Sequence, residues 1–116
     1  MPKYYTEQNM QALRTAFEGL VMQWPQVRAK KMFGCPCYQA GGKLFAFLVN
    51  GGLVLTHLPA AEQVLLDAKF VPTVFQANQK AVPGWPQVPF AAKADLPNLL
   101  PFIRTSYQSA LEDAGA

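Results

Sequence analysis

The sequence has few residues that could bind a metal ion or a cofactor, or form the disulfides that stabilise many exported proteins. It contains two cysteines and one histidine, and only 15% of its 116 residues are charged. Cys35 and Cys37 are separated by one residue, so a bond between them would not join distant parts of the chain. The longest apolar stretch, Leu44–Val49, is far shorter than the roughly 20 residues of a membrane helix, and the first residues lack the apolar core of a secretory signal. We therefore expect a cytoplasmic protein without a membrane partner.

Length and composition predict one folded domain. A second domain would leave each half of the 116 residues too short to bury a core of its own. The chain is 51% hydrophobic and 12% aromatic, which is too apolar for a disordered chain. We treat residues 1–116 as a single domain and expect no second one.

Hydrophobic periodicity in the first half predicts a helix followed by strands. Thr6 can cap a helix whose apolar residues recur every three or four positions as far as Trp24, and Pro25 closes it. Extended runs separated by glycine-containing turns, as antiparallel hairpins require, follow at residues 27–33, 37–40, 43–49 and 53–57. The run at 43–49 is apolar on both alternating faces and is therefore expected to be a central strand.

The second half predicts a short helix, weak strands and a final helix. The short helix spans residues 59–70, with Ala61, Val64, Leu65 and Ala68 at helical spacing, and we expect it to lie across the sheet. Prolines limit the next segment to short edge strands at residues 73–76 and 87–91. The last helix is capped by Asp95 or Asn98; Asn98 is favoured because Pro101 then falls in the first turn, and the chain should fray from Glu112. The expected fold is α+β, with an antiparallel sheet of about five strands packed by N- and C-terminal helices and one short middle helix.

The positive charge lies in the first half of the chain. Residues 1–58 carry six basic and two acidic side chains, whereas residues 59–116 carry four basic and five acidic ones. Arg28, Lys30 and Lys31 fall on one predicted strand, where Lys30 shares a side with Arg28 and faces opposite to Lys31. With Lys43 on a neighbouring strand, they are our candidates for contact with nucleic-acid phosphates. The alternative is a solvated strand edge protected by lysines.

Cys35, Cys37 and Trp85 are the candidates for a ligand or redox site. Two thiolates can supply half of a zinc site, but the sequence has no second cysteine pair and only His57 as an imidazole. We therefore expect no metal, no cofactor and no catalytic residues. The two thiols can instead be packed and reduced, and the Trp85 indole either offers a stacking platform or covers the core. A ligand-, redox- or metal-sensing module around these residues is the alternative function.

Several segments resemble a known family. Lys31-Met32-Phe33-Gly34 and the residues that follow to Tyr38, together with segments 42–46 and 53–55, look like the N-terminal domain of the competence regulator TfoX, also called Sxy. Segments 82–84 and 95–97, followed by a C-terminal helix, match the outline of that family, and the resemblance covers residues 10–111. It implies a fold similar to that of the YjbR-like proteins, for which DNA binding has been proposed, and it brings no agreed catalytic motif.

The resemblance also sets the functional expectation. Full-length competence regulators of this type carry a further C-terminal domain, which we do not expect here. We expect a non-enzymatic domain that regulates transcription or competence through DNA or through a partner protein. A homodimer is a further alternative.

Overall fold

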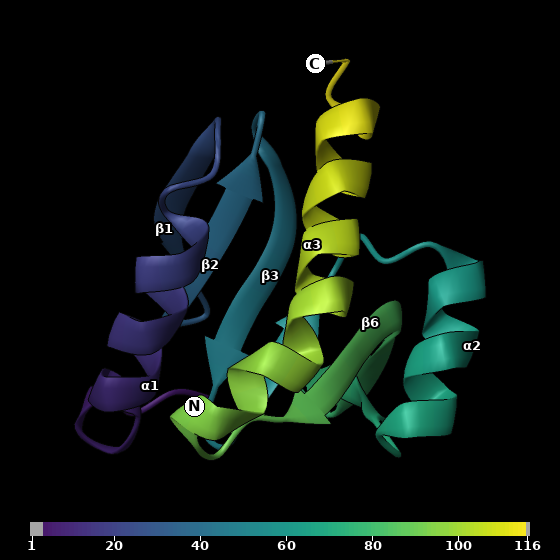
Figure 1. Ribbon diagram of the computed structural model, residues 1–116. Helices are drawn as coiled ribbons and strands as arrows, with labels where there is room; N and C mark the ends of the chain where they lie inside the picture. Colours follow the sequence, from purple (N-terminus) through teal and green to yellow (C-terminus); the bar gives the residue numbers. More distant parts are fainter. Residues whose placement is uncertain (1–3, 116) are drawn as a thin grey trace.

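The computed structural model describes residues 4–115 and shows helices packed against an antiparallel sheet (Figure 1). The elements are α1 (Glu7–Val21), β1 (Val27–Met32), β2 (Cys35–Ala40), β3 (Lys43–Val49), β4 (Gly52–Leu55), α2 (Ala60–Lys69), β5 (Thr73–Ala77), β6 (Lys80–Pro89), the 3-10 turn η1 (Lys93–Asp95) and α3 (Leu96–Asp113). The strands form one sheet in the order β1-β2-β3-β4-β6-β5. The predicted α+β class and the three helices are confirmed, with six strands where about five were expected.

A first hydrophobic core lies between the sheet and the helices α1 and α3. Each helix buries the residues that recur at steps of three and four, as an amphipathic helix does on a protein surface. Those from α1 are Met10, Leu13, Phe17 and Val21, and those from α3 include Leu99, Ile103, Tyr107 and Ala110. α3 packs mainly along β3, so the central position predicted for that strand is confirmed.

A second hydrophobic core lies on the opposite face of the sheet, under the β5–β6 hairpin. Its buried members are Cys35, Cys37, Phe47, Val49, Val54 and Phe75. The ring centroids of Phe47 and Phe75 are 4.9 Å apart, although β3 and β5 are three strands apart in the sheet, a separation of about 14 Å in a flat sheet. The sheet therefore curls, and the hairpin closes over β2 and β3.

β6 is an interior strand, so the prediction of a short edge strand at residues 87–91 was wrong. Gln87 pairs with Val54 of β4 on one side and with Thr73 of β5 on the other. Residues 82–85 have no register partner on β5 because the register shifts there, which takes Pro83 out of the ladder. Gly84 has φ of 82°, a conformation that glycine adopts without steric cost. The irregularity explains how a proline-rich segment forms a paired strand.

α2 does not bury the stripe that its sequence suggested. Leu66 is its buried residue, while Val64 and Leu65 are 66% and 56% exposed. The ring of Phe70, directly after the helix, contacts that of Phe102 on α3 at 5.9 Å. The four apolar residues at helical spacing, Ala61, Val64, Leu65 and Ala68, are all exposed, so this face of α2 is open to solvent.

The ends of α3 also differ from expectation. The helix begins at Leu96, with Asp95 as its N-cap residue, and the Asp95 carboxylate accepts backbone hydrogen bonds from Ala91 and Ala92 at 3.0 Å. Asn98 and Pro101 lie inside the helix, so the favoured Asn98 cap was wrong. The helix continues to Asp113 instead of fraying from Glu112, and the Asp113 carboxylate faces Lys43 of β3 and His57, just after β4.

α1 begins where predicted but ends earlier. Thr6 occupies the N-cap position without a side-chain cap bond. Its hydroxyl instead accepts a hydrogen bond from the Asn50 side-chain amide, at 3.2 Å. The helix ends at Val21, and the Trp24 backbone N–H donates to the Val21 carbonyl in the turn that follows. The start of α1 is thus tied to the β3–β4 turn.

Candidate binding surface along β1

β1 is one edge of the sheet, and its basic side chains divide between the two faces. Lys30 pairs with Cys37, whose side chain lies in the second core, whereas Lys31 pairs with Pro36 beside α1. Arg28, two residues before Lys30, shares the face of Lys30. All three cations are exposed, and none has an ion pair among residues 4–115. We call the exposed side of β1, with Arg28, Lys30 and Lys31, the basic edge.

Lys43 lies apart from the basic edge. It begins β3, and β2 separates that strand from β1. Its ammonium is 3.9 Å from the Asp113 carboxylate, which also lies 3.1 Å from Nε2 of His57. The four predicted phosphate contacts therefore comprise three residues on one strand and a fourth that joins the C-terminal end of α3 to the sheet.

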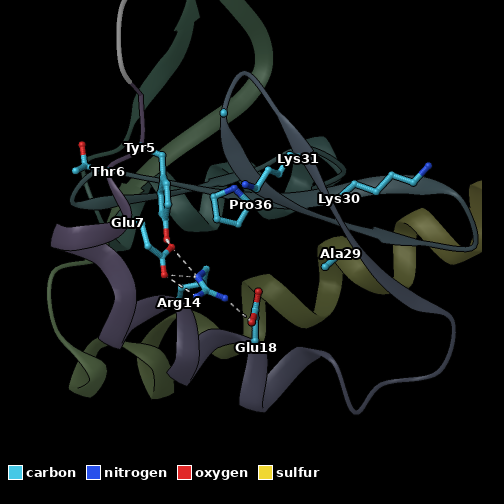
Figure 2. A pocket seen from close by; sticks show the side chains of 10 residues that line it. Tyr5, Thr6, Glu7, Arg14, Glu18, Ala29, Lys30, Lys31 and Pro36 are labelled. Atoms are coloured by element: carbon cyan, nitrogen blue, oxygen red, sulfur yellow. Dashed lines mark hydrogen bonds and ion pairs between the residues drawn. The ribbon is translucent and has the colours of Figure 1, made fainter.

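A pocket of about 670 Å³ lies between α1 and the basic edge (Figure 2). Its lining comes from three places: the start and face of α1 with the residues just before it, β1, and the β1–β2 turn region. Figure 2 shows Lys31 extending toward Pro36 at the pocket, whereas Lys30 points away from α1. The lining residues are Tyr5, Thr6, Glu7, Arg14, Glu18, Ala29, Lys30, Lys31, Gly34 and Pro36. We call it the α1–β1 pocket.

Arg14 organises the α1 wall of this pocket. Its guanidinium holds the Glu7 carboxylate with two nitrogens, at 2.9 and 2.6 Å, and reaches Glu18 Oε1 at 3.0 Å. Tyr5 donates its hydroxyl to Glu7 at 2.6 Å, and Tyr38 donates to Glu18 at 2.8 Å. The network joins the segment before α1, the helix itself and β2, so it fixes the shape of the wall.

The network is built to keep its charges, because each contact favours the ionisation state already present. Hydrogen bonds from Arg14, and then from Tyr5, lower the pKa of the Glu7 carboxyl. Burial and the bond to Glu7 raise the pKa of Tyr5 to about 12, and burial and Glu18 raise the pKa of Tyr38 as well. These shifts move the pKa values of the three groups further from pH 7, whereas a general acid or base works best with a pKa near the working pH.

Cys35 and Cys37 lie inside the second core as free thiols. Burial raises the pKa of Cys35 to about 11, and burial with the neighbouring Cys35 raises the pKa of Cys37 to about 12. Reactive and metal-binding cysteines need the thiolate form, which these values disfavour. Residues 4–115 contain no group of three or more side chains suited to a metal ion.

Trp85 covers the second core and also lines a smaller cavity. Its ring contacts those of Phe47 and Phe75, with centroids 5.6 and 6.1 Å away. A cavity of about 350 Å³ lies between α2 and the β5–β6 hairpin, and Trp85 forms part of its wall. The structure therefore places the three ligand or redox candidates in or against the second core.

Sequence reasoning missed Tyr5, Glu7, Arg14 and Glu18 as parts of a site. The signal that could have found them is the spacing of the charged residues: Arg14 follows Glu7 by seven positions and precedes Glu18 by four, which puts all three on one helix face. Nothing in the sequence reveals that this face turns toward β1.

The family comparison agrees with the resemblance seen in the sequence. The TfoX N-terminal domain family matches residues 19–110, most of the chain, and the protein belongs to that family. Neither the curated proteins nor the solved structures gave a match. None of the helices within residues 4–115 combines the length and the hydropathy of a membrane-spanning segment.

Proposed function

We propose that the protein is a cytoplasmic regulatory domain with no reaction of its own, and that it binds an acidic, extended segment of a partner protein along the basic edge. One observation carries the proposal: the edge strand of the sheet is exposed and holds three basic side chains beside a pocket. Membership of the TfoX N-terminal domain family supports a regulatory role.

The backbone of β1 supports the addition of a further strand. On an edge strand, alternate residues direct their N–H and C=O groups away from the sheet, where an extended peptide can pair with them. Ala29, in the middle of β1, is exposed and small, so a peptide can approach the strand closely. Such pairing supplies affinity without any special side-chain chemistry.

The side chains supply the preference for acidic residues. Arg28 and Lys30 are two residues apart on one face of β1, which spaces them by about 6.8 Å. Side chains on one face of an added strand have the same spacing, so two acidic residues that alternate with uncharged ones meet both cations. The uncharged side chains then point toward the α1–β1 pocket, where Tyr5 and Pro36 provide apolar surface.

Double-stranded DNA is the second candidate, because the same cations can contact phosphates. The charges on the α1 side of the basic edge favour a protein segment over DNA. Glu7 and Glu18 line the pocket there as carboxylates held by Arg14, and they repel a polyanion wide enough to cover both faces of β1. An alternating peptide places its acidic residues on the other face and avoids this repulsion.

Fluorescence anisotropy with three labelled probes tests the proposal. The probes are a short peptide that alternates glutamate and valine, a peptide of the same composition with the glutamates in one block, and a DNA duplex of about 20 base pairs, each at about 50 and 200 mM salt. The charge-reversed variant is Arg28→Glu/Lys30→Glu. Lys80→Glu/Lys93→Glu is the matched control, since it makes the same change in charge at exposed positions elsewhere.

The alternating peptide should bind more tightly than the block peptide and lose at least about tenfold in affinity in the Arg28→Glu/Lys30→Glu variant alone. Methylating the backbone nitrogens of either the valines or the glutamates then tests strand addition. One of the two methylated peptides should lose binding, because only alternate N–H groups face β1. Tighter binding of the duplex than of either peptide would favour the DNA candidate and contradict the proposal.

A further inference from the structure

α2 presents an apolar face that no part of the described chain covers. Ala61, Val64, Leu65 and Ala68 are all exposed, and we call them the α2 stripe. Val71, just beyond the helix, is 90% exposed and extends the apolar surface. Figure 1 shows α2 at the margin of the molecule, with β6 and α3 on its inner side. Contiguous exposed apolar surface on a small domain marks an interaction site.

The contacts of α2 fix its orientation, so the stripe is not turned inward by a small rotation. Leu66 is fully buried in the first core, and Gln63 donates its side-chain amide to the Leu58 carbonyl at 2.9 Å. The Phe70 ring packs edge-on against Phe102. These three residues lie on the side of the helix opposite to the stripe. The contacts on the opposite side of the helix therefore keep the α2 stripe exposed.

The stripe is symmetric along the helix. Its members recur at positions i, i+3, i+4 and i+7, the spacing of the residues that form the seam between two packed helices. When a second α2 lies antiparallel across it, Ala61 meets the partner's Ala68, and Val64 meets the partner's Leu65. The small alanines at both ends allow the two helices to approach closely.

The charges beside the stripe match the same arrangement. Glu62 lies in the first turn of α2 and Lys69 in the last, on the same flank of the stripe. In an antiparallel pair about a two-fold axis, Glu62 lies next to the partner's Lys69, and Lys69 next to the partner's Glu62. In a parallel pair about a two-fold axis, the two flanks would lie on opposite sides of the seam and Glu62 would not meet the partner's Lys69, so the charges favour the antiparallel arrangement.

We propose that the α2 stripe binds a second copy of this chain, with the two α2 helices antiparallel about a two-fold axis. This dimer contact is independent of the binding proposed for the basic edge, which belongs to the opposite edge of the sheet from β5. α2 has 10 residues and is about 15 Å long, so the contact is smaller than the roughly 1,200 Å² of a standard stable interface. The dimer is therefore weak.

Sedimentation velocity of the full chain, from about 20 µM to about 1 mM, tests the dimer. The wild-type chain should shift from monomer to dimer across this range, and Leu65→Glu should stay monomeric. Met22→Glu is the matched control, because Met22 is an exposed apolar residue at the end of α1, and it should dimerise like the wild type. Circular dichroism confirms that each variant is folded.

Charge reversal tests the antiparallel arrangement. Glu62→Lys and Lys69→Glu should each weaken the dimer about tenfold, since each places two pairs of like charges in contact. An equimolar mixture of the two variants should restore association, because every contact in the mixed dimer joins opposite charges. A wild-type chain that stays monomeric at about 1 mM, a Leu65→Glu chain that still dimerises, or a mixture that stays as weak as its components would each overturn the proposal.

Discussion

Arg14 shows how single residues shape the candidate site. Its guanidinium bridges Glu7 and Glu18, and each carboxylate also accepts a tyrosine hydroxyl. The arginine is therefore fully engaged within the wall and is not offered to a ligand. The cations available to a partner are those of the basic edge, which is why the proposed contact rests on β1 and not on α1.

The Glu7–Arg14 pair predicts a specific pH dependence of stability. The pKa of Glu7 is lower in the folded protein than its ordinary value of 4.5, first because Arg14 donates hydrogen bonds to it. The stabilisation is therefore present above that ordinary value and is lost as the pH falls through the lower, folded value. Urea unfolding of the wild type and Glu7→Gln from neutral to acidic pH measures this effect, and the difference in free energy of unfolding should shrink on acidification.

Glu112→Gln provides the control for this prediction. Glu112 is exposed near the end of α3 and has no ion pair among residues 4–115. Its substitution should change the free energy of unfolding little at any of these pH values. A Glu7→Gln difference that stays constant with pH would mean that the ionised pair does not stabilise the fold.

At the scale of elements, α2 gives the sharpest prediction. Leu65 and Leu66 are neighbours in sequence, yet one is 56% exposed and the other fully buried. Leu66→Ala should lower the free energy of unfolding by about 2–5 kcal/mol, since it removes a packed side chain and leaves a cavity. Leu65→Ala should change it by less than about 0.5 kcal/mol. Urea unfolding of both variants at low protein concentration, where the chain is monomeric, compares them directly.

The pair of variants serves as its own control, because the same substitution is made at adjacent positions of one helix. Equal losses of stability would place α2 in a different orientation and would remove the basis for the α2 stripe. A larger loss at Leu65 would restore the orientation that the apolar spacing alone suggests.

α2 also shows what the sequence can and cannot predict about elements. The existence of the helix follows from its composition and from Pro59, but its orientation does not, because the apolar side chains at helical spacing face solvent. The start of β3 gives a second case. Phe45 is an extra residue between two registers of the β2–β3 pair, so Phe45 and Ala46 both reach the first core. Strict alternation places them on opposite faces, and only tertiary packing selects the bulge.

For the candidate site too, the sequence predicts local features but not contacts between distant segments. The sequence identifies Arg28, Lys30 and Lys31 and the alternation that splits them, because both depend on local geometry. It does not identify the α1–β1 pocket, since the position of α1 over β1 depends on contacts between residues distant in sequence. Tyr38 reaching Glu18 from β2 is one such contact.

At the scale of the whole molecule, the two cores share one sheet. β3 gives Phe45 and Leu48 to the first core and Phe47 and Val49 to the second, so neither core can lose its packing without disturbing the strand that supports the other. Ser106 of α3 adds to this coupling, because its hydroxyl donates to the Phe45 carbonyl at 2.7 Å and accepts the His57 backbone N–H at 3.1 Å. The chain should therefore unfold as one cooperative unit.

The two tryptophans allow this prediction to be measured, because each reports on one core. Trp24 packs against Tyr107 beside the first core, and Trp85 packs against Phe47 and Phe75 in the second. Trp85→Phe leaves Trp24 as the only fluorescent indole, and Trp24→Phe leaves Trp85. For each variant, the urea midpoint from tryptophan fluorescence should coincide with the midpoint from far-ultraviolet circular dichroism.

Comparing two probes within each variant removes the effect of the substitution on stability, since both probes then follow the same molecule. The most informative departure would be a Trp85 signal that changes at lower urea than the circular dichroism of the same variant. The β5–β6 hairpin would then open from β2 and β3 while the first core stayed folded, exposing Phe47 and Phe75. Coincident midpoints in both variants mean that curling of the sheet and packing of the helices form in one step.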